Sequence, residues 1–504
     1  MNRPNRRSRR IRHTVLAAAL LCAGLTAHAG TGLRLGEAGY FSNRGLAVLT
    51  FRNVYDGTSS DAKTAGVELI HHGVRTATNG DVRLAPTPEQ WDAAATLIDR
   101  KVDPASGAVT TRMRFDAEDF EYSVRVAPRG DGVAIQVLLD RPLPQALAGK
   151  AGFNLEFLPS AYFGKAWLAD GRGGQVPLYP SGPSGRAQDG GTVRLPMASG
   201  RRLVLAPEDA QRRVSIKSPG AELRLYDGRN QAQNGWYVVR SLLPSGKTGT
   251  VLEWHLSAST EPGWTRETVI GHSQVGYHPA QRKVAVLETD RNAPAPGNAR
   301  LLRVDGDGHA REALAAVPRR WGQYLRYDYY TFDFSDVREP GLYQIEAAGQ
   351  RTAAFRIADD AYATAWHPTL DVFFPVQMDH MFVNEAYRVW HGRSHMDDAR
   401  QVAPGKEHFD LYGQGPELDS PFQPGEHIPG LAIGGWFDAG DFDLRTQTHY
   451  STVMSLVDTW ELFGPRRDET TIDQKRRHVE IHRPDGVPDL LQQIEHGTLM
   501  LIAQ

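Results

Sequence analysis

The 504-residue sequence contains a single cysteine, Cys22, which lies within the first 29 residues. That segment carries six arginines and no acidic residue, followed by an apolar run over 14–25 and by Ala-His-Ala at 27–29. A basic start, a short apolar core and a small-x-small ending predict a signal peptide over residues 1–29. After its removal the chain has no cysteine, which excludes disulfides, thiolate metal ligands and a cysteine nucleophile.

The chain also lacks an excess of positive charge and any long apolar run. Lys and Arg number 57 against 59 Asp and Glu, and removal of the arginine-rich segment makes the balance more acidic. This charge argues against nucleic acid as a partner. Beyond the signal segment no apolar run reaches the roughly 18 residues of a spanning helix, so we expect no membrane partner after cleavage. We expect a periplasmic or secreted monomer.

Hydrophobic periodicity divides the rest of the chain into three expected domains. Residues 30–264 alternate apolar and polar residues in many short stretches separated by Gly, Pro and Asp turns, which predicts a large β-sandwich. Residues 265–358 repeat this pattern over the length of an immunoglobulin-like β-sandwich. Residues 359–504 change to a helical pattern. The helices are expected over 361–386, 447–463 and 488–503.

Two carboxylates three positions apart stand out in the segment GGWFDAGDFD, residues 434–443. The small Ala and Gly between Asp438 and Asp441 allow a tight turn that aims both side chains at one point. Converging carboxylates can hold a water molecule and accept its proton, which is the general-base step of an inverting glycosidase. The neighbouring Trp436 and Phe437 offer flat apolar surface for stacking against a sugar ring.

Two other interpretations of these residues stay open. Asp438, Asp441 and Asp443 are spaced as in an oxygen-rich calcium loop, although the twelve-residue spacing and terminal Glu of an EF-hand are missing. The segment also fits a solvated turn that caps a helix beginning near Arg445. We therefore expect no cofactor, and a structural calcium ion is left open.

The segment resembles the Asp-Ala-Gly-Asp motif of glycoside hydrolase family 9, a cellulase family with an (α/α)6 barrel. Three further segments resemble the family in the same order. They are similar to the opening strand of its immunoglobulin-like domain, to the stretch before the catalytic loop and to the start of the next barrel helix. These segments are His272–His278, Ser394–Ala399 and Asp485–Leu491. The resemblance implies an inverting hydrolase of β-1,4-glycosidic bonds in cellulose, β-glucan or oligosaccharides.

The resemblance also implies roles for individual residues. Asp441 would be the general base and Asp438 its partner in positioning the attacking water. The residues expected to contact the polysaccharide or oligosaccharide substrate are Trp436, Phe437, Asp443 and His395. The family's general acid is a Glu late in the barrel, and no segment of this chain corresponds to it. We therefore expect the acid beyond residue 504, and a chain that is inactive alone.

The expected fold is multidomain: a large β-sandwich, an immunoglobulin-like β-sandwich and the N-terminal part of an all-α (α/α)6 barrel. Where many family members have cysteines of a structural zinc site, this chain has Ser394 before His395 and Gln377-Met-Asp-His380, so we expect no metal there. Paired carboxylates favour an enzyme. The alternative from another class is a non-catalytic carbohydrate-binding or scaffolding protein.

Overall fold

The structure of the chain is a computed structural model, which describes residues 32–55, 63–88, 92–187, 190–229, 235–396, 398–405, 415–418, 420–438 and 442–504. The predicted signal peptide, residues 1–29, and the predicted general base, Asp441, lie outside the described residues. Two compact units follow each other along the chain, with a change near Thr260, and each is considered by itself. None of the described helices is long and apolar enough to cross a membrane.

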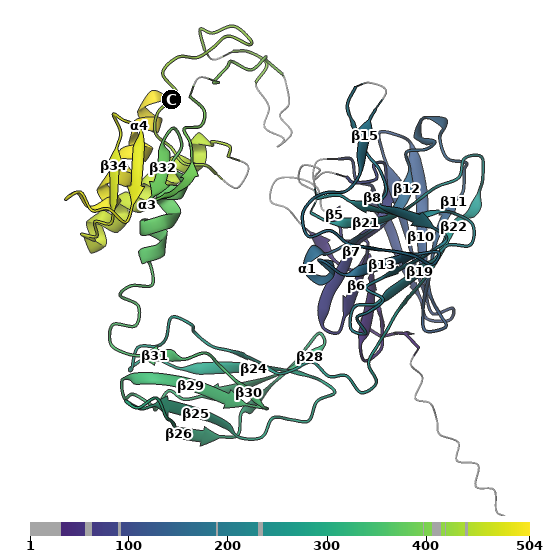
Figure 1. The fold of residues 1–504 in the computed structure, drawn as a ribbon, viewed down its shortest axis with the longest axis horizontal. Coiled ribbons are helices and arrows are strands. Elements are labelled where there is room, and N and C mark those ends of the chain that lie inside the picture. The colour runs from purple at the N-terminus through teal and green to yellow at the C-terminus, as the bar shows by residue number, and fades with distance from the viewer. Residues whose placement is uncertain are drawn as a thin grey trace, which may run out of the picture. The chain divides into compact units, whose positions relative to one another are not determined.

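The first unit is a β-sandwich of two nine-stranded antiparallel sheets (Figure 1). In spatial order the first sheet comprises β1 (Arg34–Leu35), β2 (Phe41–Ser42), β3 (Leu46–Thr50), β6 (Val67–His71), β7 (Val74–Arg83), β12 (Gly152–Phe157), β21 (Tyr237–Leu242), β20 (Leu223–Asp227) and β17 (Ala198–Gly200). The second comprises β14 (Arg172–Gln175), β13 (Ala166–Ala169), β18 (Arg202–Leu205), β19 (Val214–Lys217), β22 (Gly249–Ala258), β11 (Gly132–Leu139), β10 (Phe120–Arg129), β9 (Ala108–Phe115) and β8 (Thr96–Asp103).

Short elements connect the strands of this unit. They are η1 (Gln145–Leu147), α1 (Pro159–Tyr162) and the hairpin of β15 (Ser184–Arg186) and β16 (Thr192–Arg194). The strand pair β4 (Val54–Tyr55) and β5 (Lys63–Thr64) is grouped with the second unit.

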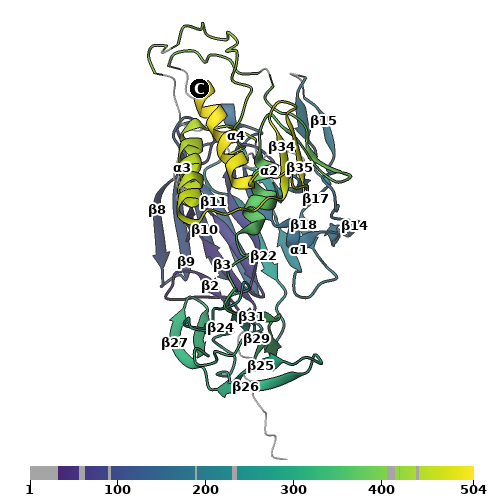
Figure 2. The same cartoon turned by 90° about the vertical axis from the view of Figure 1, so that its left-hand side faces the viewer.

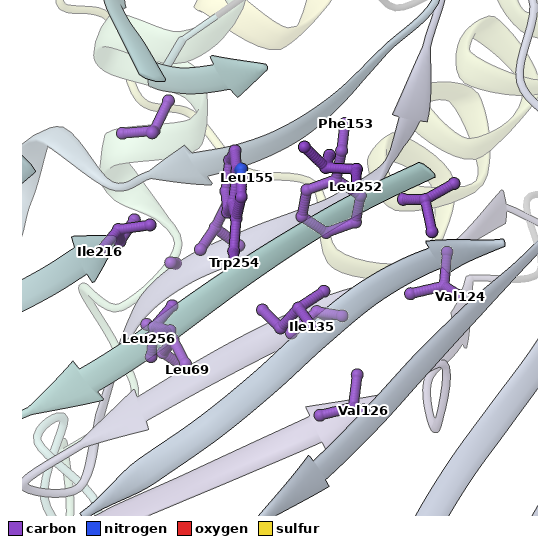
Figure 3. Close-up of a cluster of buried hydrophobic side chains, with 14 of the residues drawn as sticks. Leu69, Val124, Val126, Ile135, Phe153, Leu155, Ile216, Leu252, Trp254 and Leu256 are labelled. Atoms are coloured by element: carbon purple, nitrogen blue, oxygen red, sulfur yellow. The ribbon is translucent and has the colours of Figure 1, made fainter. Parts of the chain in front are cut away.

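One hydrophobic core fills the space between the two sheets (Figure 3). Strand β10 shows why the pattern folds this way: every second residue from Phe120 to Val126 is buried, because successive side chains of a strand point to opposite faces. Phe153 of the first sheet meets Trp254 of the second edge to face, with ring centroids 4.9 Å apart. The indole N–H of Trp254 donates to Ser241 Oγ at 3.0 Å, so its one polar group is satisfied in the core.

The second unit begins with an immunoglobulin-like sandwich that has a hydrophobic core of its own. One sheet contains β23 (Val269–Gly271), β24 (Val284–Asp290), β28 (Tyr327–Asp333) and β27 (Arg319–Tyr324). The other contains β26 (Ala310–Ala316), β25 (Ala299–Val304), β29 (Gly341–Ala347) and β30 (Gln350–Arg351), with β31 (Phe355–Ile357) also paired to β29.

The rest of the second unit combines helices with a small sheet. The helical elements are η2 (Thr369–Phe373), a π-helical turn, α2 (Phe374–Gln377), α3 (Thr446–Phe463) and α4 (Asp489–Ala503). The sheet has the order β33 (Arg388–His391), β32 (Phe382–Glu385), β35 (His478–Ile481) and β34 (Thr470–Asp473). Helices α3 and α4 lie side by side (Figure 2).

Two of the three predicted helices are confirmed. Helix α3 ends where the sequence predicts, because Gly464 adopts a left-handed φ of 53° and its N–H donates to Trp460 O at 2.9 Å. Helix α4 begins directly after Pro488. The expectation of one helix over 361–386 is wrong: after η2 and α2 the chain becomes extended, and β32 pairs in parallel with β35.

Candidate active site

The site is built around a short loop, residues 434–438, which precedes α3 and which we call the carboxylate loop. It starts with Gly434 and Gly435, both left-handed, with φ values of 68° and 84°. A Cβ added to Gly434 would lie 2.3 Å from His496 O, and one added to Gly435 would lie 2.6 Å from Met500 Sδ. The two glycines are therefore needed both for the backbone conformation and for the close approach of the loop to α4.

Asp438 ends the described part of the loop and is held by its backbone and its side chain. Its N–H donates to Asp443 O at 2.8 Å, which closes the turn. Its Oδ2 lies 2.9 Å from Arg445 Nε, and the same Nε lies 2.8 Å from Asp443 Oδ2. One guanidinium thus holds two carboxylates, while the Asp438 side chain keeps 27% of its surface exposed. The positions of Ala439, Gly440 and Asp441 lie outside the described residues.

Trp436 is a core residue in this structure, with only 5% of its surface exposed. Its indole N–H donates to Gln493 Oε1 at 2.8 Å, and its ring stacks on His449 with centroids 5.6 Å apart. A Cβ on Gly497 of α4 would lie 2.3 Å from its Cη2. Trp436 therefore joins the loop to α3 and α4, which leaves little of the ring for the predicted stacking against a sugar.

Phe437 is equally buried and lies among other rings. Its centroid is 5.3 Å from that of His391, 6.1 Å from that of His395 and 4.7 Å from that of Phe442. Phe442, with a left-handed φ of 63°, is 50% exposed. The aromatic surface open to solvent at this turn thus belongs to Phe442. Phe437 and Phe442 lie in the same sequence motif, and nothing in the sequence pattern shows which of the two is exposed.

A cavity of about 180 Å³ lies beside the carboxylate loop. It is lined by Phe373, Phe374, Gln377, Trp436, Phe437, Asp438, Thr448, His449 and Thr452. Carboxylate, hydroxyl and aromatic groups therefore share one small cavity, a combination suited to binding water and part of a sugar ring.

His395 lies in a neighbouring network rather than beside Asp438. Its Nδ1 hydrogen-bonds Oδ2 of Asp379, a fully buried carboxylate whose Oδ1 accepts the N–H of His380 at 2.6 Å. His395 and His380 line a second cavity of about 290 Å³, together with Met396, Asp398, Ala399, His427, Ile428, Pro429, Gly430, Leu431, Ala432, Leu444 and Gln504. Asp379 belongs to the segment Gln377-Met-Asp-His380, for which the sequence predicts no site role.

Burial shifts the protonation of two histidines near the loop. Desolvation lowers the pKa of His496 to about 3, although its hydrogen bond to Gly435 O opposes this. Desolvation also lowers the pKa of His380, against the attraction of Asp379. The imidazole of His496 is therefore neutral at ordinary pH.

Among the described residues, three potential metal ligands come together at one place. Asp305, Asp307 and His309 lie close enough to share an ion, in the turn between β25 and β26. There Oδ2 of Asp305 accepts from Arg311 Nε at 2.8 Å. The calcium interpretation of Asp438, Asp441 and Asp443 depends on Asp441 and stays open.

Comparison with known proteins identifies the immunoglobulin-like part first. Residues 266–352 match the cellulase N-terminal Ig-like domain family. A cellodextrinase of Butyrivibrio fibrisolvens is 26% identical over 230 residues, which cover 44% of this chain and 35% of that protein. Endoglucanase C of Cellulomonas fimi is 28% identical over 251 residues, which cover 47% of this chain and 21% of that protein. Both similarities are longer than the Ig-like match and so extend beyond it.

The chain is related to a cellodextrinase and an endoglucanase and carries a cellulase N-terminal Ig-like domain. The resemblance to cellulases seen in the sequence is thereby confirmed. The chain spans about a third of the cellodextrinase and about a fifth of the endoglucanase.

Solved structures give weaker matches. A metagenome-derived glycoside hydrolase family 9 endoglucanase is 23% identical and superposes with a TM-score of 0.35, covering 47% of this chain and 40% of that one. A Bacteroides ovatus family 9 protein is 20% identical with a TM-score of 0.34, covering 45% and 37%. The relationship to the cellulases does not depend on these superpositions.

Proposed function

We propose that this chain is part of an exported glycoside hydrolase that cleaves β-1,4-glycosidic bonds of cellulose, β-glucan or their oligosaccharides with inversion. In this proposal Asp441 is the general base and Asp438 positions the attacking water. The observation that carries the proposal is the carboxylate loop, which presents a partly exposed Asp438 on a firmly bonded backbone in a relative of a cellodextrinase and an endoglucanase.

The surroundings of Asp438 suit a residue that orients water. Arg445 Nε, 2.9 Å from Oδ2, fixes the side chain, and Thr448 Oγ1 lies 3.5 Å from Oδ1. The adjoining cavity of about 180 Å³ exceeds the ~30 Å³ that a water molecule occupies in the liquid. A water bound there would be held by fixed groups before the reaction, as general-base catalysis requires.

The burial and the hydrogen-bond partners of each predicted contact residue decide how we propose that it touches the substrate. Trp436 and Phe437 contribute to the wall of this cavity, so we propose contact with sugar along those edges. Phe442 adds the exposed ring that Trp436 does not offer. Asp443 and His395 remain proposed contacts, with Asp443 restrained by Arg445 and His395 by Asp379.

We propose the same division of the chain as the sequence suggests: residues 30–264, 265–358 and 359–504. In the last part, α3 and α4 are proposed as two helices of an (α/α)6 barrel, because they pack side by side beneath the carboxylate loop.

Asparagine substitutions of the two carboxylates test this function. Asp441→Asn and Asp438→Asn, made in the protein as its gene encodes it, are assayed for the release of reducing ends from cello-oligosaccharides. We expect kcat to fall about 10²- to 10⁴-fold for Asp441→Asn, because general-base assistance is lost. The control is Asp458→Asn, which changes an exposed carboxylate on α3 and should leave hydrolysis unchanged. Unchanged hydrolysis in Asp441→Asn would refute the assignment.

Binding distinguishes the enzyme from a carbohydrate-binding protein. Asp441→Asn should keep its affinity for cello-oligosaccharides in calorimetry while turnover is lost. Proton NMR of the first product formed should show the anomer opposite to the cleaved β-linkage. Formation of the β-anomer as the first product would contradict the general-base role.

A further inference from the structure

Three buried histidines from three different elements bond the backbone of the carboxylate loop. They are His380, which follows α2, His449 of α3 and His496 of α4, and all three are buried. No sequence pattern groups them, and the proposed reaction does not use them. We propose that these imidazoles are positioning residues, which hold Gly434, Gly435 and Trp436 so that Asp438 is presented in one geometry; this inference rests on the proposed function.

The backbone groups of the loop find partners almost entirely outside it. Gly434 O accepts from His380 Nδ1 at 2.7 Å. Gly435 O accepts from His496 Nε2 at 2.8 Å and from Asp379 N at 2.9 Å, which uses both of its lone pairs. The N–H of Phe437 donates to Gln377 O at 2.8 Å. The loop is therefore fixed by side chains and backbone of neighbouring elements rather than by a regular ladder.

His449 contacts backbone groups through both of its ring nitrogens. Its Nδ1 contacts Arg445 O, at the start of α3. Its Nε2 lies 2.8 Å from the N–H and 2.8 Å from the carbonyl oxygen of Trp436. Replacement of this ring by an apolar side chain would leave a buried N–H without its partner.

The hydrogen-bond partners of His496 assign its tautomer. Its Nε2 faces Gly435 O and must donate, so in the neutral ring Nδ1 accepts. Nδ1 lies 3.1 Å from the side-chain amide of Gln474. With that amide turned so that its NH2 group faces the ring, Gln474 donates to Nδ1, since amide O and N are interchangeable in assignment. The low pKa of His496, about 3, agrees with the neutral ring.

His380 combines its hydrogen bond with an unusual backbone. Its φ of 61° is left-handed, a conformation that asparagine and aspartate tolerate best among residues other than glycine. Asn at this position keeps an N–H donor for Gly434 O, whereas Asp has the same size without a donor. The position therefore offers a matched pair of substitutions that leave the backbone unstrained.

The test compares substitutions that keep the hydrogen bond with substitutions of similar size that remove it. The pairs are His449→Gln with His449→Met, His496→Gln with His496→Met, and His380→Asn with His380→Asp. His309→Leu, at an exposed turn of the Ig-like domain, is the control. Hydrogen exchange of the peptide containing residues 434–438 is measured by mass spectrometry, and kcat and KM are measured on cello-oligosaccharides.

We expect the Met and Asp variants to exchange the loop amides at least about tenfold faster, while the Gln and Asn variants stay within about threefold of the wild type. In the same variants kcat should fall about 10- to 100-fold, with KM nearly unchanged. Equal exchange within each pair of folded variants would overturn the proposal, as would equal kcat values. Where the Met variants do not fold, the pair at His380 decides by the same criteria. If the protein hydrolyses no glucan, the proposed function fails but loop exchange still tests the positioning role.

Discussion

Acidification should remove the stability that one group, His496, contributes to the C-terminal part of the second unit. Burial lowers its pKa to about 3, against 6.5 for an ordinary histidine. Because the unfolded chain takes up this proton more readily than the folded chain, stability is complete above pH 6.5 and is lost as the pH falls toward 3. Each pH unit below 6.5 costs about 1.4 kcal/mol, so the loss at pH 5 is about 2 kcal/mol.

Asp489 acts in the opposite direction and has to be separated from His496. It lies buried at the start of α4, and desolvation raises its pKa to about 6 from 3.8. A carboxyl that prefers its proton in the folded state contributes stability at low pH, and this contribution is lost as the pH rises from 3.8 to 6. His496→Gln keeps a donor for Gly435 O and does not titrate. The difference between this variant and the wild type therefore isolates His496.

The assay is peptide-resolved hydrogen exchange of α4 at pH 7.5, 6.5 and 5.0, corrected for the intrinsic pH dependence of exchange. Between pH 7.5 and 5.0 the wild type should lose about 2 kcal/mol of local stability relative to His496→Gln. The control His309→Leu should follow the wild type at every pH. An identical pH dependence in wild type and His496→Gln would refute the assignment of a neutral, buried His496.

Three further substitutions test other parts of the structure. In an exposed helix, replacing Gly by Ala stabilises by about 1 kcal/mol. Gly497→Ala should instead lower the unfolding temperature, because its Cβ would lie 2.3 Å from the Trp436 ring and the overpacking costs about 1–3 kcal/mol. A raised Tm would contradict this reasoning. Arg240→Met should lower the free energy of unfolding of the first unit in urea by about 1–3 kcal/mol, because the buried guanidinium donates to several backbone carbonyls and to Asn154 Oδ1. Equal or higher stability would count against this role. Arg467 donates two hydrogen bonds to the carboxylate of Asp371, from Nε at 2.6 Å and from Nη2 at 2.7 Å. A double-mutant cycle with Asp371→Asn and Arg467→Gln should give a coupling free energy of about 1–3 kcal/mol. Additive effects would show that the pair contributes nothing.

Local sequence patterns predict the elements that pair with a neighbour close in sequence and the helices that end at a capping residue such as Gly. The alternation in β10 predicts its buried face, and Gly464 predicts the end of α3. The segment after α2 was predicted as helix because Met378, Met381 and Phe382 continue the apolar pattern that begins at Leu370, and short apolar runs fit a helix or a strand equally well. Its strand pairs in parallel with β35, about a hundred residues later, and nothing in its own sequence specifies that partner.

For the candidate site, too, local sequence predicts only those features that do not depend on residues distant in the chain. The spacing of Asp438 and Asp441 and the small residues between them single out the loop, but the burial of Trp436 is decided by Gln493 and Gly497 on α4. An aromatic residue beside two carboxylates is compatible with sugar contact and with core packing. Only the three-dimensional neighbours separate the two roles, and here they place most of the ring in the core.

The construction of the loop also links its order to the stability of the helices. Gly434 and Gly435 allow the left-handed turn, but glycines lose the most conformational freedom on ordering, so the loop needs compensating contacts. Those contacts come largely from residues of α3, α4 and the segment after α2, through His449, His496 and His380. Any change that loosens α4 should therefore release Gly435 and disorder Asp438 before the sheet of this part unfolds. Protonation of His496 should produce this sequence of events, with loop amides exchanging ahead of those in β32 and β35.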